Sequence, residues 1–558
     1  MDSVESQIQK VVHKLFAVEV QVAVTRPDAE HGDFATNVAL QLSKQLGKNP
    51  RDVAQQIADE LNGGVQSKQG IGEVSIAGPG FINLRLIDKA ILKSLKQPTV
   101  TPKSLAGKSN VVEYSDPNPF KVLHVGHLYD SIVGESIATL QENAGATVHR
   151  VNFGGDVGLH VGKTMWAILQ YIGGENPEEL YKIPEHERAV WLSNRYVEGT
   201  NAYEDNEAAR SEIIEYNKQV YALHAHNDHG SPFAQVYWTA RQWSYEYFDA
   251  FYHRIGTKFE KYYPESVTAP VGITAVREQL AKGVFKESDG AVVFDGEAVG
   301  LHTRVFINSN GLPTYEAKDI GLALCKWQDY QFDQTVIITG NDIVEYMKVI
   351  LAALSQFEPE IAKRTTHITH GMVKMAGGIK MSSRKGNILM AVDVLNMAAE
   401  AIKKAGRTPT EFVVQGAIKY EFLKSRIAGD VIFDPDESVS LEGNSGPYLQ
   451  YAHARAHSIL AKSQAAATAP ADLEAGERAL AVKITEYSEV ITKATSELAP
   501  HLICTYLYEL AQAFNRFYEQ NRVVGDPRET QRLYLVKQYV TVLKHGLGLL
   551  GIQAPEKM

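Results

Sequence analysis

The chain has 558 residues, of which 44% are hydrophobic and 22% are charged, and its formal net charge is −10. This length is too great for one hydrophobic core and predicts roughly three or four domains. Such a composition is typical of a soluble globular protein and excludes long disorder. The acidity disfavours a protein that coats DNA, since that binding needs many cations, but it leaves a shaped RNA open as a partner.

The expected location follows from hydropathy and cysteine content. No run of about 18 apolar residues is present, so we expect no membrane-spanning segment. The start, from Met1 to Val20, mixes charged and apolar residues and lacks the apolar stretch of a signal peptide. Cys325 and Cys504 form neither a disulfide framework nor a CxxC metal site, so we expect a reducing cytoplasm.

The pattern of expected helices and strands changes twice along the sequence, which predicts three domains. Residues 1–100 alternate helical and β-like runs and end in a proline-containing linker, as in an α+β domain. Residues 101–400 have an α/β pattern with a large helical insertion at about 165–300. Residues 401–558 are almost wholly helical, with a bundle-type apolar stripe at 502–517, and predict an all-α domain.

The second domain begins with a βαβ pattern. Residues 111–114 predict a strand, a helical pattern covers 126–142, and residues 147–152 predict the next strand. Further strands are expected at 303–308, 335–339 and 367–373. This order of elements is typical of a parallel sheet covered by helices.

A short histidine motif, His124-Val125-Gly126-His127, stands where the first strand gives way to its helix. A glycine there lets the backbone approach a ligand, and a helix N-terminus offers N–H groups to phosphate. Two flanking histidines can donate to phosphate oxygens as charge shifts. Taken alone, the motif equally fits two surface histidines at a helix start.

A second motif, the segment 380–387 (KMSSRKGN), follows a short apolar strand and the Gly377-Gly378 turn. Lysines and hydroxyl residues on a mobile loop suit the binding and release of a triphosphate. By itself such a run is more often a solvated basic loop.

Together, in this order and on these elements, the two motifs resemble the HIGH and KMSKS signatures of class I aminoacyl-tRNA synthetases. The resemblance implies a Rossmann-type catalytic domain that binds ATP, with Mg²⁺, between the motifs. The catalytic residues that it implies are His124, His127, Lys121 and Lys380. The implied ATP-binding residues are Gly126, His124, His127, Met372, Val373, Lys380, Met381, Ser382 and Ser383. Gly155, Asp156 and Gly158 resemble the GDxG element beside that site.

One position departs from the second signature. Ser383 stands where the family has its second lysine, and it supplies no positive charge. Family members with a degraded second signature often carry a lysine at the position of Lys121, which precedes His124 by three residues. The resemblance therefore implies that Lys121 and Lys380 together offset the charge on the leaving pyrophosphate, with Lys385 as a third candidate.

Acidic residues near these motifs indicate which amino acid is bound. Glu113 ends the first strand, and ligands bind at that edge of open α/β sheets. Tyr315 and Asp319 lie four residues apart in an expected helix and so share one face. Acidic groups that converge on a pocket suit a planar guanidinium, although each acid alone also fits an exposed surface charge.

The whole pattern resembles the arginyl-tRNA synthetase family over nearly the entire chain. The resemblance implies an arginine–tRNA ligase, monomeric like its relatives, that activates L-arginine with ATP and transfers it to the terminal ribose of tRNA(Arg). The implied arginine-binding residues are Glu113, Asn118, His124, Tyr315, Asp319 and Asn341. Asn341 falls where the family usually has a different polar residue.

Segments at both ends of the chain carry the resemblance further. Residues 31–37 and 78–83 resemble the family's amino-terminal domain, which reads the tRNA elbow, and residues 446–453 resemble the opening of its anticodon-binding bundle. The implied tRNA-binding residues are Phe81, Asn83, Tyr448, Tyr451, Tyr518 and Met558. Aromatic rings suit stacking on unpaired bases, and each equally fits a core position.

Alternative interpretations rest on weaker patterns. Segment 158–164 nearly matches a P-loop but has three residues between its glycines, where the motif needs four. His224, His226 and His229 have no cysteine or obvious fourth ligand nearby, so we expect no metal site. A cysteine-specific synthetase is disfavoured because its zinc-ligand cysteines are absent. A nucleotidyltransferase that acts without tRNA and a non-catalytic RNA-binding paralogue stay open, and arginine-dependent charging of tRNA distinguishes them.

Overall fold

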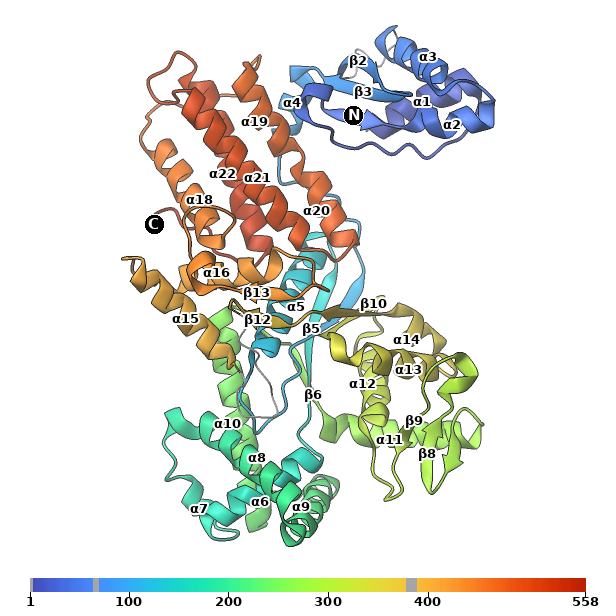
Figure 1. Ribbon diagram of the computed structural model, residues 1–558, viewed down its shortest axis with the longest axis vertical. Helices are drawn as coiled ribbons and strands as arrows, with labels where there is room; N and C mark the ends of the chain where they lie inside the picture. The colour runs from blue at the N-terminus through green and yellow to red at the C-terminus, as the bar shows by residue number, and fades with distance from the viewer. Residues whose placement is uncertain (1–3, 64–69, 378–388) are drawn as a thin grey trace.

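The computed structural model describes residues 4–63, 70–377 and 389–558. Figure 1 shows a C-terminal group of helices standing beside the N-terminal domain, with the central sheet below them and two further lobes at the other end. No helix within the described ranges is both long enough and apolar enough to cross a membrane.

The N-terminal domain is α+β, as predicted. Its antiparallel sheet has the strand order β1-β3-β2, so the predicted alternation of helical and β-like runs is present in this domain. The strands are β1 (Phe34–Thr36), β2 (Ile71–Ala77) and β3 (Phe81–Leu86). The helices are α1 (Val4–Phe16), η1 (Ala29–His31), α2 (Val38–Leu46), α3 (Pro50–Gly63) and α4 (Asp88–Ser94).

The catalytic core is a five-stranded parallel sheet of order β11-β10-β4-β5-β6, which confirms the Rossmann-type expectation. Its strands are β4 (Ser109–Glu113), β5 (Thr147–Gly154), β6 (Lys261–Pro264), β10 (Gln334–Gly340) and β11 (Thr365–His370). Because strand side chains alternate, Val112 packs with α5 (Val125–Asn143) on one face and Val111 packs on the other. The second face is covered by α11 (Glu265–Ala281), α12 (Tyr315–Tyr330), α13 (Val344–Ser355) and α14 (Pro359–Arg364).

The prediction of helix throughout 165–300 is wrong at 261–264 and within 286–294, where the chain forms strands. Helices fill the part before these strands: α6 (Leu159–Ile172), α7 (Pro177–Leu180), η3 (Glu185–Glu187), α8 (Arg188–Asp205), α9 (Glu207–Ala225) and α10 (Pro232–Ile255). The chain then returns to the central sheet as β6, and an antiparallel sheet follows, made of β7 (Lys286–Ser288), β8 (Ala291–Phe294) and β9 (Arg304–Ile307). The Asp289-Gly290 turn between β7 and β8, with φ of 49° and 75°, is a hairpin signal. The short η4 (Gly296–Val299) and η5 (Asn341–Ile343) complete this part.

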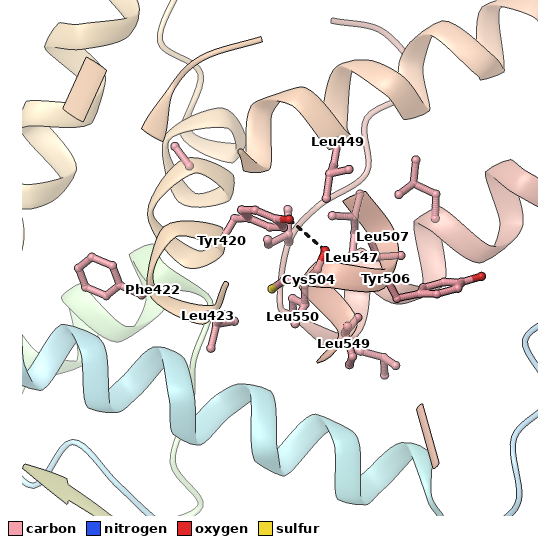
Figure 2. Packing of buried hydrophobic residues seen from close by; sticks show 14 of the residues in the cluster. Tyr420, Phe422, Leu423, Leu449, Cys504, Tyr506, Leu507, Leu547, Leu549 and Leu550 are labelled. Carbon is pink, nitrogen blue, oxygen red and sulfur yellow. Dashed lines mark hydrogen bonds between the residues drawn. The ribbon is translucent and has the colours of Figure 1, made fainter. Parts of the chain in front are cut away.

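The C-terminal part is the predicted helical bundle, and β12 (Val373–Met375) and α15 (Ala391–Lys404) lead into it. Its elements are α16 (Glu411–Leu423), β13 (Val431–Phe433), α17 (Pro435–Ser438), α18 (Gly446–Ala461), α19 (Ala475–Thr485), α20 (Tyr487–Ser496), α21 (His501–Gln520) and α22 (Glu529–Leu549). Figure 2 shows side chains of α16, α18, α21 and α22 packing together, with the Tyr420 hydroxyl donating to the Cys504 carbonyl at 3.0 Å. The predicted apolar stripe at 502–517 lies in α21.

The catalytic domain and the bundle share one hydrophobic core. Helix α5 lies between them, and its buried residues Ile132 and Ile137 join the sheet residue Val112 to Leu423 and Leu547 of the bundle in a single cluster. A displacement of the bundle therefore displaces α5.

The C-terminal segment ties the bundle to α5. Every second backbone carbonyl from Leu549 to Pro555 accepts a side-chain hydrogen bond from α5, α16 or α18. The donors are Ser136 (3.3 Å), Lys419 (2.6 Å), Gln450 (2.9 Å) and His453 (2.7 Å). Burial lowers the pKa of Lys419 to about 8.

Ion pairs join the N-terminal domain to the bundle. The Arg478 guanidinium of α19 donates to both carboxylate oxygens of Asp33, at 3.1 and 2.7 Å. A second, more exposed pair joins Arg26 and Glu489 at 2.7 Å. These contacts fix the N-terminal domain against the bundle, away from the central sheet.

The position of α12 depends on two glycines at its crossing with α11. A Cβ atom added at Gly272 would lie 1.8 Å from the Ala317 carbonyl oxygen, and one added at Gly321 would lie 2.0 Å from that of Thr268. Since both obstacles are backbone atoms, neither can yield without moving a helix.

We predict that Gly272→Ala destabilises the protein by roughly 1–3 kcal/mol, because the new methyl group forces α12 away from α11. Thermal unfolding should show a lower midpoint, and the KM for arginine should rise because α12 carries Tyr315 and Asp319. Gly548→Ala is the control, since an added Cβ there meets no atom within 4 Å. A Gly272→Ala protein that unfolds like the wild type would contradict this packing.

Candidate active site

The HVGH motif caps the N-terminus of α5 through its own histidines. The His124 Nδ1 atom accepts a hydrogen bond from the Gly126 N–H at 3.1 Å, and the His127 Nδ1 atom accepts one from the His124 N–H at 3.1 Å. The two rings stack with their centres 3.7 Å apart. Because each Nδ1 is an acceptor, a neutral ring carries its proton on Nε2, which leaves two N–H donors at a helix N-terminus.

Both histidines are neutral near pH 7. Burial, together with the charges of Lys121 and His370, lowers the pKa of His124 to about 4. Burial also holds the pKa of His127 well below its ordinary value, with added effects from His124 and Lys121. The two imidazoles of the motif therefore act as neutral hydrogen-bond donors and do not titrate near physiological pH.

The residues of the second signature, Lys380, Met381, Ser382 and Ser383, lie outside the described residues. The chain after them meets the first motif directly: the Leu389 carbonyl accepts the Val125 N–H at 2.9 Å, and Met390 forms an isolated β-bridge with His124. The residues that directly follow the second motif in the sequence therefore contact the first motif.

The aspartate of the GDxG element is a structural anchor. The Asp156 carboxylate is fully buried and accepts hydrogen bonds from the Ser266 N–H at 2.8 Å, the Ser266 hydroxyl at 2.7 Å and Arg241 Nε at 3.0 Å. It thereby holds the end of β5 to α10 and α11, and its oxygens are occupied without a ligand. Asn118 lies at the same place, where its side-chain oxygen accepts the Gly155 N–H at 2.9 Å.

The acidic residues converge as the sequence predicts. Glu113 and Asp319 line one small enclosed cavity between β4, β10, α12 and α13. Asp116 and Asp130 lie near Glu113, and burial together with the Glu113 charge holds the pKa of each well above its ordinary value. Carboxyl groups crowded in this way ionise together only when a cation joins them.

Two partners of these acids were not predicted from the sequence. Lys326, buried on α12, forms an ion pair with Glu113, and the Tyr346 hydroxyl of α13 donates to Asp319. Burial raises the pKa of Asp319 to about 7, while the bond from Tyr346 and the charge of Lys326 act in the opposite direction. Lys326 lies two helical turns after Asp319, a spacing that could have identified it.

The remaining predicted arginine and ATP positions do not line this cavity. Tyr315 is 55% exposed at the start of α12, and Asn341 is exposed directly after β10. Met372 is exposed next to β12, but its N–H already donates to the Asp430 carboxylate at 2.8 Å. Val373 pairs with Val431 in the parallel β12–β13 ladder.

Lys121 lies beside the HVGH motif, in the loop between β4 and α5. Its ammonium is 3.9 Å from the ring centre of Tyr196, which belongs to α8 in the helical lobe. Its charge contributes to the lowered pKa of His124, His127 and His160, each after the larger effect of burial. The structure thus brings a cation to the place where the family resemblance predicts one.

The two predicted elbow contacts in the N-terminal domain differ in exposure. Phe81, at the start of β3, is 42% exposed, whereas Asn83 is buried in the same strand between Ala35 and Ser75. Of the two, only Phe81 has an exposed side chain. Contact of either with tRNA stays a prediction.

The predicted anticodon contacts share one side of the bundle. Tyr451 is 43% exposed on α18, and Arg455, one turn later, lies 5.0 Å from the ring centre of Tyr518 on α21. Tyr448 is partly buried nearby on α18, and the terminal Met558 is exposed.

The histidine trio of the helical lobe is part of its aromatic packing. The His224 ring is hydrogen-bonded to the Tyr237 hydroxyl at 2.8 Å, and His229 stacks on Trp238 with ring centres 4.5 Å apart. Within the described part of the chain, no cluster of three His, Cys, Asp or Glu side chains could hold a metal ion.

A parallel sheet with a histidine-capped helix after its first strand, together with a second basic motif in the sequence, is typical of a class I aminoacyl-tRNA synthetase. Residues 89–434 match the family described as "tRNA synthetases class I (R), catalytic domain". Residues 2–86 match "Arginyl tRNA synthetase N terminal domain", and residues 449–558 match "DALR anticodon binding domain". The chain belongs to the arginyl-tRNA synthetase family.

Curated relatives and solved structures agree with this assignment along the whole chain. The chain is 29% identical over 590 residues to an arginine–tRNA ligase of Porphyromonas gingivalis, with 98% of each covered. It is 30% identical to one of Phocaeicola vulgatus, covering 97% of this chain and 96% of that one. The arginyl-tRNA synthetase of Thermus thermophilus superposes with a TM-score of 0.80 at 25% identity, covering 100% of this chain and 99% of that chain. The domain bounds near residues 100 and 400 stay predictions.

We predict that arginine binding strengthens as pH rises through about 7, the pKa of Asp319. Below that pH the free enzyme holds Asp319 protonated, and a guanidinium must first displace the proton. The KM for arginine, measured at saturating ATP, should therefore rise roughly tenfold for each pH unit below about 7. Ionisation of His124, near 4, lies outside this window.

Tyr346→Phe provides the matched test of this prediction. Because the lost hydroxyl favours ionised Asp319, the variant should show the same rise in KM starting at a higher pH. A KM for arginine that stays constant between about pH 6 and 8 in the wild type would show that Asp319 does not meet the guanidinium.

Proposed function

We propose that this chain is an arginine–tRNA ligase that works in two displacements. The arginine carboxylate attacks the α-phosphorus of ATP, the bond to the β-phosphate breaks, and pyrophosphate leaves. A hydroxyl of the terminal ribose of tRNA(Arg) then attacks the carbonyl of the arginyl-adenylate, and AMP leaves. The observation that carries the proposal is the buried carboxyl cluster at the sheet edge, next to a helix N-terminus with free imidazole donors.

Glu113 and Asp319 are the proposed guanidinium ligands. Their shared cavity is lined mainly by apolar residues, so an ion pair there is strong, and an uncharged side chain leaves Lys326 as the counter-charge of Glu113 and brings none to Asp319. Tyr315 at the start of α12 and Asn118 beside the GDxG element complete the proposed arginine site, with Asn341 and His124 at its border.

His124 and His127 are the proposed donors to the phosphates. Each presents an Nε2–H group at the N-terminus of α5, where the helix dipole also favours negative charge. Gly126 lets the phosphates approach the backbone. Donors fixed in this way before the reaction stabilise charge that develops as the α–β bond breaks, which favours the transition state over the ground state.

Lys121 and Lys380 are the proposed cations for the leaving pyrophosphate. Mg²⁺ supplies further neutralisation of the β- and γ-phosphates when it is bound with ATP. Because the described residues contain no cluster of three metal-binding side chains, we assign its ligands mainly to the nucleotide phosphates. Met372, Val373, Met381, Ser382 and Ser383 are the proposed remaining contacts to ATP.

The N-terminal domain and the bundle are the proposed tRNA-binding parts. Phe81 and Asn83 would meet the elbow, while Tyr448, Tyr451, Tyr518 and Met558 would meet the anticodon loop. One chain holds the carboxyl cluster, the HVGH helix and both of these parts, so we propose that it acts as a monomer. Cys325 and Cys504 are both free thiols, which is consistent with the reducing cytoplasm that we propose as its location.

The test of this function is ATP–pyrophosphate exchange across the amino acids, with and without tRNA(Arg). Arginine alone should support exchange, and family membership leads us to expect that exchange needs the tRNA. Exchange with another amino acid would overturn the assignment of the pocket. Arginine-dependent adenylate formation without any charging of tRNA would favour a nucleotidyltransferase.

We predict that Lys121→Ala lowers the rate of adenylate formation about 10²-fold or more while the KM for ATP changes only a few-fold, because its charge acts on the leaving group. The measurement is single-turnover arginyl-adenylate formation with tRNA bound. Ser383→Lys, which restores the family lysine, should partly rescue the variant. A wild-type rate in Lys121→Ala would leave Lys121 as a solvated loop charge.

Tyr451→Ala should raise the KM for tRNA by an amount equivalent to roughly 1–3 kcal/mol, the usual contribution of an aromatic ring stacked on a base. Since Tyr451 is 43% exposed, its removal should leave the melting temperature nearly unchanged. Tyr181→Ala, at a more exposed tyrosine of the helical lobe, is the matched control and should not affect tRNA. A lower melting temperature with unchanged KM for tRNA would mean that Tyr451 serves packing.

A further inference from the structure

The Lys121 ammonium lies 3.9 Å from the ring centre of Tyr196. A cation over an aromatic face is attracted by the electron-rich ring without being neutralised by it. Tyr196 comes from α8, a helix that contributes none of the other proposed catalytic residues. The ring thus restrains a lysine whose charge stays available to an anion.

The pKa of Tyr196 reports the proximity of this charge. Burial alone would raise the pKa of its hydroxyl, yet the charge of Lys121 and a hydrogen bond from it, helped by Thr200 and Lys163, lower it overall. The same Lys121 charge lowers the pKa of the two imidazoles of the HVGH motif. The Lys121 charge therefore acts on both the Tyr196 side chain and the HVGH motif.

We propose that Tyr196 is a positioning residue for adenylate formation, which holds the Lys121 ammonium beside the HVGH motif and so gives the helical lobe a direct part in the chemistry. The proposal rests on the proposed role of Lys121. A lysine side chain has four rotatable bonds, and a free one spends little time in any single position. By restricting that freedom, the ring keeps the charge where the pyrophosphate departs.

The same lobe offers a matched control. Lys163 of α6 lies 4.7 Å from the ring centre of Tyr203, which is also on α8. This second lysine–tyrosine pair has the same chemistry and joins the same lobe, but neither residue belongs to the HVGH loop. Tyr203→Leu therefore reproduces the structural consequences of losing such a pair without affecting Lys121.

The experiment is single-turnover arginyl-adenylate formation by the full-length enzyme with tRNA(Arg) bound, at varied ATP. Tyr196→Leu and Tyr196→Met should each lower the maximal rate about tenfold and leave the KM for ATP within about threefold. Tyr196→Phe, which keeps the ring, should stay within about threefold of the wild type, and Tyr203→Leu should match the wild type. Two non-aromatic replacements of different shape, with melting temperatures measured for each, separate loss of the ring from loss of folding.

A double-mutant cycle decides whether Tyr196 acts through Lys121. The Lys121→Ala/Tyr196→Leu enzyme should be no slower than Lys121→Ala, because the ring then has nothing to position. Additive losses, or a wild-type rate in both non-aromatic variants while Lys121→Ala is slow, would overturn this inference alone. A wild-type rate in Lys121→Ala would instead overturn the proposed role of Lys121.

Discussion

The arrangement of the whole molecule depends on the burial of helix α5. Its N-terminus carries the two histidines, and its body packs against the parallel sheet on one side and the helical bundle on the other. At Gly134 an added Cβ would lie 2.2 Å from the Tyr114 ring, so the helix is pressed against the end of β4. A helix confined in this way has a rigid first turn. The capping hydrogen bonds of His124 and His127 hold the two imidazole rings against that turn, so their Nε2–H donors are fixed in position.

The site has two different electrostatic environments, one for the phosphates of ATP and one for the amino acid. For the phosphates it presents neutral imidazoles, a helix N-terminus and a lysine held by an aromatic ring, so that positive potential is available without buried anions to neutralise it. For the amino acid it presents crowded carboxyls around Glu113, with Lys326 as a partial counter-charge. Without a ligand, each environment holds polar or charged groups that lack a partner, which costs free energy. An anionic phosphate stabilises the first environment, and a cationic side chain stabilises the second.

The sequence predicts what is local and periodic. The βαβ start, the bundle stripe and the order of the two motifs follow from spacing, and the convergence of Glu113 with Asp319 follows from the rule that ligands bind at the carboxyl ends of parallel strands. The hairpin at Asp289-Gly290 was missed because each of its strands is too short to show alternation, although the turn itself is a recognisable signal. The strand β6 was missed for the same reason.

Partnerships between distant segments could not be predicted from the sequence. The pairing of Lys326 with Glu113 joins residues far apart in the chain, as does the bond from Tyr346 to Asp319 and the contact of Lys121 with Tyr196. Asp156 was assigned to the nucleotide site by its motif, but its carboxylate instead holds α10 and α11 to the end of β5. In each case the partner of a side chain is determined by which helix packs against it, and that depends on tertiary packing.

The central claim is that a buried cluster of carboxyl groups selects the substrate by its charge. Citrulline tests it most directly, since it has nearly the shape of arginine and carries a neutral urea in place of the guanidinium. The measurement is kcat/KM for charging tRNA(Arg) with each amino acid by the wild-type enzyme near pH 7.5. We predict a preference for arginine of at least about 10³-fold, because citrulline brings no cation to Asp319 and leaves the crowded carboxyl groups with Lys326 as their only counter-charge among the described residues. Charging of citrulline within about tenfold of arginine would show that shape governs selection and would contradict it.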